Sequence, residues 1–152
     1  PYRNGMPHGK ETVWHENGRK RSEVTYRNGR EHGVQTAWNE NGEKLSEISF
    51  KDGVVDGDAV RYYASGQKQT VIPHRTGRPH GTRTDWYEDG KKRSEIRYVN
   101  GMREGLSTEW DAEGRKRTET PYTKGLKHGE ARYWDDQGKL SVTRWSEGKQ
   151  LP

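Results

Sequence analysis

Four histidines, each followed by glycine, are the residues best suited to metal binding or general-base chemistry. They are His8, His32, His80 and His128. These histidines are multiples of 24 residues apart, so equivalent atoms of neighbouring repeats would lie about 10 Å apart. Zinc needs its nitrogen ligands within about 2.1 Å of one ion. Asp56 and Glu104 replace the histidine in two repeats, as a polar turn position allows. We therefore expect no metal site and no cofactor.

A second candidate for chemistry is a column of carboxylates, with arginines nearby in the sequence. The column is Glu23, Glu47, Glu95 and Glu119, and the arginines include Arg21, Arg93 and Arg117. Paired carboxylates cleave glycosides when a cleft gives them unlike environments. A repeated column on an open sheet gives like environments, so we predict a salt-bridge lattice on the solvated face. Because phosphate-binding loops and nucleophile elbows are also missing, we predict a protein that is not an enzyme, without catalytic residues.

The element that positions these side chains is a repeat of 24 residues, marked by glycine. Three glycine series keep this period: Gly5, Gly29, Gly53, Gly77, Gly101, Gly125; Gly9, Gly33, Gly57, Gly81, Gly105, Gly129; and Gly18, Gly42, Gly66, Gly90, Gly114, Gly138. Only Gly148 departs from the series, by one residue. A fixed period in this range indicates a repeat array. We predict a single array over residues 1–152, with repeats starting near residues 5, 29, 53, 77, 101 and 125 and partial repeats at both ends.

Aromatic residues and turn dipeptides show that one repeat is a β-hairpin. The first aromatic column is Trp14, Trp38, Tyr62, Trp86, Trp110 and Trp134, and the second is Tyr2, Tyr26, Phe50, His74, Tyr98 and Tyr122, with Trp145 one residue early. Turn signals such as Asn17-Gly18 lie between them. A three-residue loop with Gly18 in the left-handed region pairs Trp14 with Lys20 and places Trp14, Val24 and Tyr26 on one face.

The same register predicts further contacts along the array. Lys20, Lys44, Lys68, Lys92 and Lys116 would lie opposite the first aromatic column, and hydroxyl residues such as Thr12 and Ser22 would pair across the hairpin. The segment Asn28 to Gly33 predicts a wide turn with positive φ at both ends. Because 24 is even, every repeat presents the same face. The predicted fold is all-β: an open, single-layer antiparallel β-meander solenoid of about six hairpin repeats.

The repeat also carries a family resemblance, in the segment Tyr26-Arg27-Asn28-Gly29 through Gly33 and Trp38 to Asn41-Gly42. This pattern resembles the MORN repeat, and more closely the MORN-variant repeat of bacterial YwqK-like proteins. Such proteins are often labelled antitoxin or immunity components, and others occur in the envelope or are secreted. The resemblance implies a bacterial, non-enzymatic binding role, and it is compatible with either the cytoplasm or the cell envelope and secretion.

Composition and charge limit the kinds of partner. The chain has no cysteine, so it has neither disulfides nor thiolate metal sites. The formal net charge is +5, but acids and bases are interleaved, whereas phosphate tracking needs a stripe of one sign. No apolar segment is long enough to span a membrane, and no polybasic cluster or basic amphipathic helix favours lipid. A repeat scaffold offers a surface more readily than a small-molecule cavity, so we expect a protein partner, either a toxin-like effector or an assembly component.

Columns that vary between repeats are free to recognise a partner, and two of them are predicted to face away from the tryptophans. They run Val13, Ala37, Arg61, Asp85, Glu109, Tyr133 and His15, Asn39, Tyr63, Tyr87, Asp111, Asp135. We predict a partner-binding patch at Arg61, Tyr63, Asp85, Tyr87 and Arg93, because exposed aromatics with arginine are typical of interface hot spots. The alternative is that the third repeat has simply drifted in sequence and that these residues recognise no partner.

Two functions remain open at this stage. One is a protein-binding module that covers another protein with a sheet face. The other is a structural component that assembles through sheet edges near Tyr2 and Trp145. The chain begins at Pro1, within a repeat and without an initiator Met, which is compatible with an upstream leader, anchor or further repeats.

Overall fold

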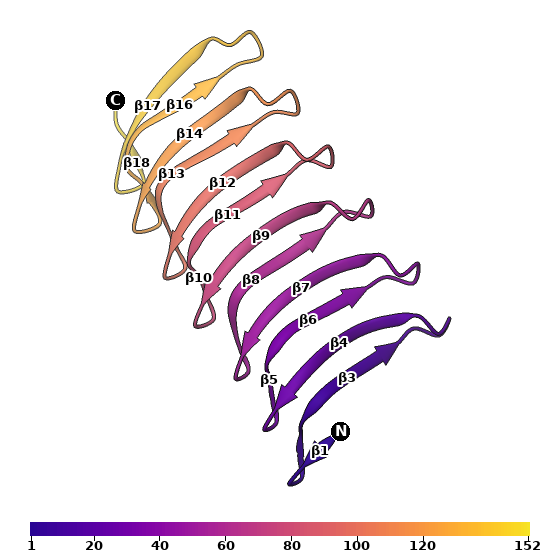
Figure 1. The fold of residues 1–152 in the computed structure, drawn as a ribbon. Helices are drawn as coiled ribbons and strands as arrows, with labels where there is room; N and C mark the ends of the chain where they lie inside the picture. Colours follow the sequence, from indigo (N-terminus) through magenta and orange to yellow (C-terminus); the bar gives the residue numbers. More distant parts are fainter. The chain divides into compact units, whose positions relative to one another are not determined.

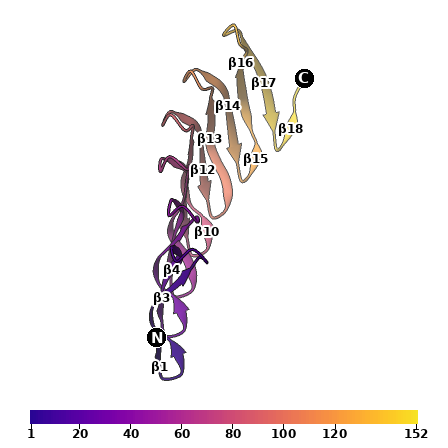
Figure 2. The same cartoon turned by 90° about the vertical axis from the view of Figure 1, so that its right-hand side faces the viewer.

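The computed structural model describes residues 1–152 and divides them into two compact units, Pro1–Arg78 (unit 1) and Pro79–Pro152 (unit 2). Each unit consists of strands, turns and loops without a helix (Figure 1). The structure therefore holds no helical segment capable of crossing a membrane. Within each unit the strands form an open antiparallel sheet that lies in one curved layer (Figure 2). The predicted all-β hairpin-repeat fold is confirmed.

Unit 1 is an antiparallel sheet in the order β3-β4-β6-β7-β8-β9, with β5 beside β4 and a separate β1-β2 pair. Its strands are β1 (Tyr2–Arg3), β2 (Met6–Pro7), β3 (Gly9–Trp14), β4 (Lys20–Arg27), β5 (Arg30–Glu31), β6 (Gly33–Trp38), β7 (Lys44–Lys51), β8 (Val54–Tyr62) and β9 (Lys68–Arg75). The short strand β10 (Arg78–Pro79) contains the boundary between the units in the sequence.

Unit 2 repeats this design in the order β11-β12-β13-β14-β16-β17-β18, with β15 beside β14. Its strands are β11 (Gly81–Trp86), β12 (Lys92–Val99), β13 (Met102–Trp110), β14 (Lys116–Thr123), β15 (Leu126–Lys127), β16 (Gly129–Trp134), β17 (Leu140–Ser146) and β18 (Lys149–Gln150). In both units each hairpin is joined to the next by a turn at the opposite end of the sheet, so consecutive strands are neighbours.

The loop inside each hairpin has the predicted length. The backbone N–H of His15 donates to the carbonyl of Arg19 at 2.8 Å, and that of Gly18 donates to His15 at 3.0 Å. Gly18 has φ 80°, which a residue with a side chain adopts only at a cost. Trp14 pairs with Lys20. The three-residue loop and the pairing of the first aromatic column with lysine are therefore confirmed.

A β-bulge one residue after this pair changes which side chains share a face. Val13 pairs with Ser22 although Trp14 pairs with Lys20, so Arg21 is an extra residue on β4. An extra residue in one strand shifts all later residues of that strand to the other face. The same shift occurs at Arg93 of unit 2, between Lys92 and Ser94.

The predicted face for the tryptophans is wrong for this reason. Val24 pairs with Glu11 and Tyr26 with Gly9, so both lie opposite Trp14. Thr12 faces Glu23 instead of Ser22, which also removes the predicted hydroxyl pairs. No turn signal marks this second irregularity, and the only trace of it in the sequence is the one-residue deletion before Trp145.

Two faces can now be defined in each unit. The tryptophan face carries the first aromatic column with the lysine and glutamate columns, and the variable face carries the second aromatic column with Val24, Ile96 and their equivalents. The buried core is divided between them: Val24, Ile96 and Ala131 are buried on the variable face, and Val60 on the tryptophan face. The sheet is therefore stabilised from both sides by a thin layer of side chains.

The predicted salt-bridge lattice exists, but lysines form it and it covers the tryptophan face. Lys20 Nζ lies 2.7 Å from Glu23, and Lys44 Nζ lies 2.7 Å from Glu47. Lys20 is also 5.7 Å from the centroid of Trp38, in the next repeat. The hydrogen bonds from Lys10 and Lys20 lower the pKa of Glu23 to about 2. The carboxylates thus hold the lysines over the aromatic column.

The connection between hairpins is tighter than predicted. Asn28 and Gly29 have φ 50° and 78°, and Arg27 pairs directly with Arg30, as in a two-residue type I′ turn. The positive φ values were predicted correctly, but the wide turn was not. Asn-Gly is the dipeptide that this turn favours, whereas the third repeat has Thr76 at φ 48°.

The last hairpin has no bulge, which explains the displaced Gly148. Trp134 pairs with Leu140 and Tyr133 with Ser141 without a register shift. The one-residue deletion therefore removes the bulge residue alone. Trp145 still pairs with Gly129, as Tyr26 pairs with Gly9 in the first hairpin.

Candidate binding surface on the variable face

Two of the four histidines of the His-Gly pairs, His8 and His80, support the turns between hairpins. Nδ1 of His8 accepts the backbone N–H of Asn28 at 3.4 Å, and Nδ1 of His80 accepts that of Asn100 at 3.4 Å. The replacements keep this role: Asp56 accepts the N–H of Thr76 at 3.2 Å and Glu104 that of Lys124 at 2.8 Å. The chain has no group of three or more His, Cys, Asp or Glu side chains arranged to hold a metal ion.

Two residues of the predicted patch, Arg61 and Tyr63, lie in unit 1. Arg61 is exposed on β8 and pairs with Ser46 on one side and Thr70 on the other. Tyr63 starts the hairpin loop, where its N–H donates to Gln67 at 2.8 Å and its carbonyl accepts from Gly66 at 2.9 Å. Both belong to the end of the sheet that carries the hairpin loops.

The other three predicted residues come together in unit 2. They line a groove of about 560 Å³ formed by Arg83, Asp85, Tyr87, Arg93, Ser94, Ile96, Arg103, Glu109, Trp110, Asp111 and Arg117. The groove extends over β11, β12, β13 and the start of β14, with the adjoining loops. Its arginines outnumber its carboxylates, and Arg93, the bulge residue, is exposed.

Asp85 is the most buried of these side chains, with 2% of its surface exposed. It accepts two hydrogen bonds from Arg83, from Nε to Oδ2 at 3.0 Å and from Nη2 to Oδ1 at 2.9 Å. The hydroxyl of Ser94 donates to Asp85 at 2.6 Å. Hydrogen bonding to Asp85 raises the pKa of Arg83. Asp85 therefore fixes the orientation of Arg83, and its own carboxylate is not offered to a partner.

Tyr87 connects two repeats of unit 2. Its hydroxyl donates to the carbonyl of Trp110 at 2.8 Å, as Nε2 of His15 contacts the carbonyl of Trp38 at 3.0 Å in unit 1. Shorter residues at the same place bond within their own loop, and Asp111 accepts the N–H of Arg115 at 2.8 Å. This column therefore stabilises the loops and leaves mainly the ring of Tyr87 for recognition.

Three segments match the family model described as the MORN repeat variant: residues 7–28, 31–52 and 79–100. These three segments, which together cover less than half of the chain, are similar to MORN-variant repeats. Each matched segment ends on the first residue of a two-residue turn, Asn28, Asp52 or Asn100, so the match coincides with one structural hairpin. A comparison with curated proteins found no match.

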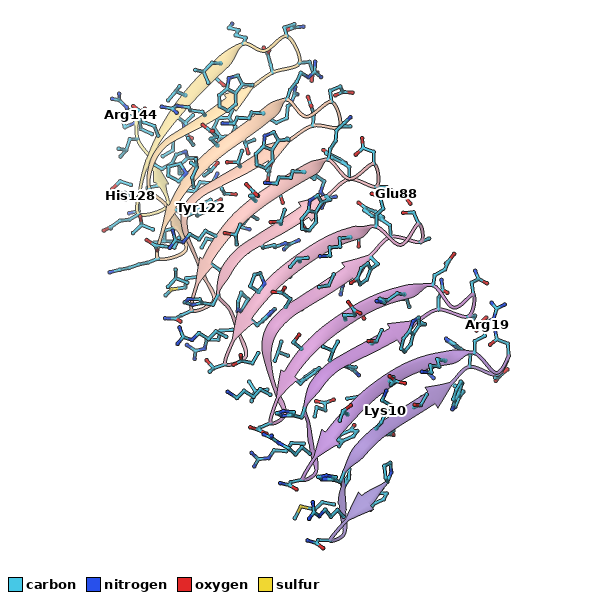
Figure 3. All side chains as sticks on the ribbon, in the orientation of Figure 1. Lys10, Arg19, Glu88, Tyr122, His128 and Arg144 are labelled. Carbon is cyan, nitrogen blue, oxygen red and sulfur yellow. The ribbon has the colours of Figure 1, made fainter.

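The hairpins of unit 2 also present cations that the sequence analysis did not select. Arg103 lies 5.1 Å from the centroid of the Tyr122 ring and donates to its hydroxyl at 3.1 Å. Hydrogen bonding to Tyr98, and then to Tyr122, raises the pKa of Arg103. Lys127 lies 4.4 Å from the centroid of Trp145. Tyr122 lies near the end of β14 away from the hairpin loops, whereas Glu88 lies in a loop (Figure 3).

Proposed function

We propose that this chain is a non-enzymatic protein-binding module, with an antitoxin-like or immunity-like role, that recognises a protein partner through the variable face. The observation that carries the proposal is the groove of unit 2. Its side chains differ from repeat to repeat, whereas the backbone beneath them is the same in each repeat. MORN repeats often mediate binding to proteins or membranes. Arginine and tyrosine side chains in such a groove are typical of interface hot spots.

Affinity purification from the native cells tests this function with two matched baits. Arg93→Glu reverses a charge in the groove, and Arg21→Glu makes the same change at the bulge residue of the first hairpin; both arginines are exposed. We expect the Arg21→Glu protein to retain the partner of the unaltered chain and Arg93→Glu to lose it. Equal recovery with both baits, measured by quantitative mass spectrometry, would contradict recognition by this groove.

A structural role is the second candidate, because apolar residues are exposed on the last hairpin. Leu140 and Val142 are each 47% exposed at the places where earlier hairpins carry the lysine and the glutamate of the tryptophan face. An exposed apolar strand is a site for strand addition. Light scattering after size-exclusion chromatography separates the candidates: a monomer at all concentrations excludes assembly through edges, and large polymers exclude a soluble neutralising partner.

A further inference from the structure

The second aromatic column has oppositely charged neighbours in the two units. In unit 1, Tyr26 lies between Glu11 and Glu31, and its pKa is raised by burial first and then by these two carboxylates. In unit 2, the equivalent Tyr98 interacts with Arg83 and Arg103. Backbone pairing is the same, since Tyr26 pairs with Gly9 and Glu31, and Tyr98 with Gly81 and Arg103. The charge reversal is therefore a property of the side chains alone.

Unit 2 extends its positive charge into a row of three cations, Arg83, Arg103 and Lys127, which we name the cationic row. Each of these side chains lies beside a ring of the second aromatic column: Tyr98, Tyr122 or Trp145. Arg83 is neutralised by Asp85. Arg103 and Lys127 form no ion pair with a carboxylate and are half-buried beside aromatic rings. Arg103 and Lys127 therefore place two positive charges without an anionic partner on the variable face.

The spacing of the row fits an extended peptide. Arg103 and Lys127 pair with equivalent residues, Tyr98 and Tyr122. They belong to β13 and β15, which are two strand intervals apart, so the two cations are separated by about 10 Å. Arg83 pairs with Ile96, two residues further along its strand, and does not continue this spacing. An extended chain rises about 3.3 Å per residue, and three residues therefore cover the distance from Arg103 to Lys127. Two carboxylates three residues apart in such a chain would reach both cations.

We propose that Arg103 and Lys127 of the cationic row bind an extended acidic protein segment in which two Asp or Glu residues stand three positions apart. This inference deepens the proposed protein-binding function by naming the chemistry of the partner. Charge complementarity supports it, because carboxylates form strong charge-assisted hydrogen bonds with arginine and lysine. The aromatic rings hold the stems of the cations in place and lower the entropy cost of binding.

A single-stranded nucleic acid fits this surface less well. Bases bind such platforms by stacking on the faces of exposed aromatic rings. Here Arg103 lies over the ring of Tyr122 and Lys127 over that of Trp145, so cations already occupy those faces. Phosphate tracking also needs more positive charges than the row supplies.

The test uses the full chain and a fluorescent peptide with two Glu residues separated by Ser-Thr, with anisotropy as the readout. A peptide of the same composition with its Glu residues adjacent is the spacing control. We expect Arg103→Ala and Lys127→Ala each to weaken binding about tenfold, because a charged hydrogen bond is lost. Lys92→Ala, which removes a cation from the tryptophan face, should leave affinity unchanged. Glu31 of unit 1 is equivalent to Arg103. A gain of peptide binding in the Glu31→Arg variant would show that a positive charge at this position is sufficient for binding.

Three outcomes would overturn the proposal: no binding of the spaced peptide at low salt, equal binding of the adjacent-Glu peptide, or equal affinity in the Arg103→Ala, Lys127→Ala double variant. Tighter binding of a labelled oligothymidine with the same dependence on Arg103 would assign the row to nucleic acid instead. Thermal melting of each variant separates loss of binding from loss of fold. If the peptide fails but Arg93→Glu still loses a cellular partner, the protein-binding function stands and only the acidic-segment chemistry falls.

Discussion

Unit 1 and unit 2 are built from the same hairpin, with the same loop, bulge and two-residue turn, yet Tyr26 in unit 1 contacts carboxylates where Tyr98 in unit 2 contacts guanidinium groups. The backbone hydrogen bonds and the glycines are alike in both. The difference teaches that this scaffold tolerates a reversal of charge beside a half-buried ring without a change of register. Recognition can therefore change from one unit to the other while the fold is conserved.

The largest expected effect distinguishes the two units at one place in the hairpin. Asp85→Ala in unit 2 leaves Arg83 without its carboxylate and Ser94 without its acceptor, so we expect a loss of about 2–3 kcal/mol in the free energy of unfolding. Val13→Ala, the equivalent change in unit 1, removes a side chain that is 40% exposed and should cost less than about 0.5 kcal/mol. Urea unfolding measures both, and similar losses would contradict a special role for Asp85.

A reciprocal exchange at the two-residue turns tests whether the scaffolds are equivalent. Thr76 in unit 1 and Asn100 in unit 2 both have positive φ, at 48° and 51°. A β-branched residue is strained there, whereas Asn is tolerated. Thr76→Asn should stabilise the chain by about 1 kcal/mol and Asn100→Thr should destabilise it by about the same amount. Thermal melting checks this, and changes of the same sign would show that the two turns differ.

The charge reversal itself is measurable at Tyr26. Glu11→Gln removes one of the two carboxylates that raise the pKa of Tyr26, so that pKa should fall. It should stay above the ordinary value, because burial is the larger cause of the shift. Titration by NMR of the ring carbons follows the change. An unaltered pKa would show that the carboxylates of unit 1 do not act on the ring.

The smallest expected effect concerns acid stability on the tryptophan face. The pKa of Glu23 is about 2 in the folded chain, against an ordinary value of 4.5 for glutamate. A lowered pKa stabilises the fold above the unfolded-state value, and this contribution is lost as the pH falls from about 4.5 to about 2. Glu23→Gln should therefore reduce the fall in melting temperature over this range. Because Glu23 is paired at the surface, the difference should be slight, and an identical pH profile would refute the pairing.

The repeat, the hairpin and the loop at Gly18 could be predicted from sequence, because glycine spacing and turn dipeptides act locally. The face of the tryptophans could not, because the extra residue Arg21 has no sequence signature and a shift of one residue inverts a strand. The deletion before Trp145 was the available clue. The last hairpin has one residue fewer than the others, and Trp145 still pairs with Gly129. Each of the other hairpins must therefore contain one residue without a partner in the ladder.

The candidate site was predicted only in part, again because the sequence did not reveal the register of the strands. Asp85, Tyr87 and Arg93 were selected from variable columns and do line one groove. Arg103 and Lys127 were not selected: their column, which also contains Glu31 and Val55, follows each two-residue turn directly and shows no constant residue type. Only the true register places that column beside the second aromatic column.

The bulge that the last hairpin lacks has a consequence for how such chains can change in length. Loss of one amino acid directly after a loop is absorbed locally, since Trp145 keeps the partner that its column has elsewhere. A deletion in the middle of β6 or β16 would remove a paired residue instead of a bulge residue. The later side chains of that strand would then move to the opposite face of the sheet. Single-codon insertions and deletions should therefore accumulate at this joint, which is also the safest point for engineering an added reporter residue.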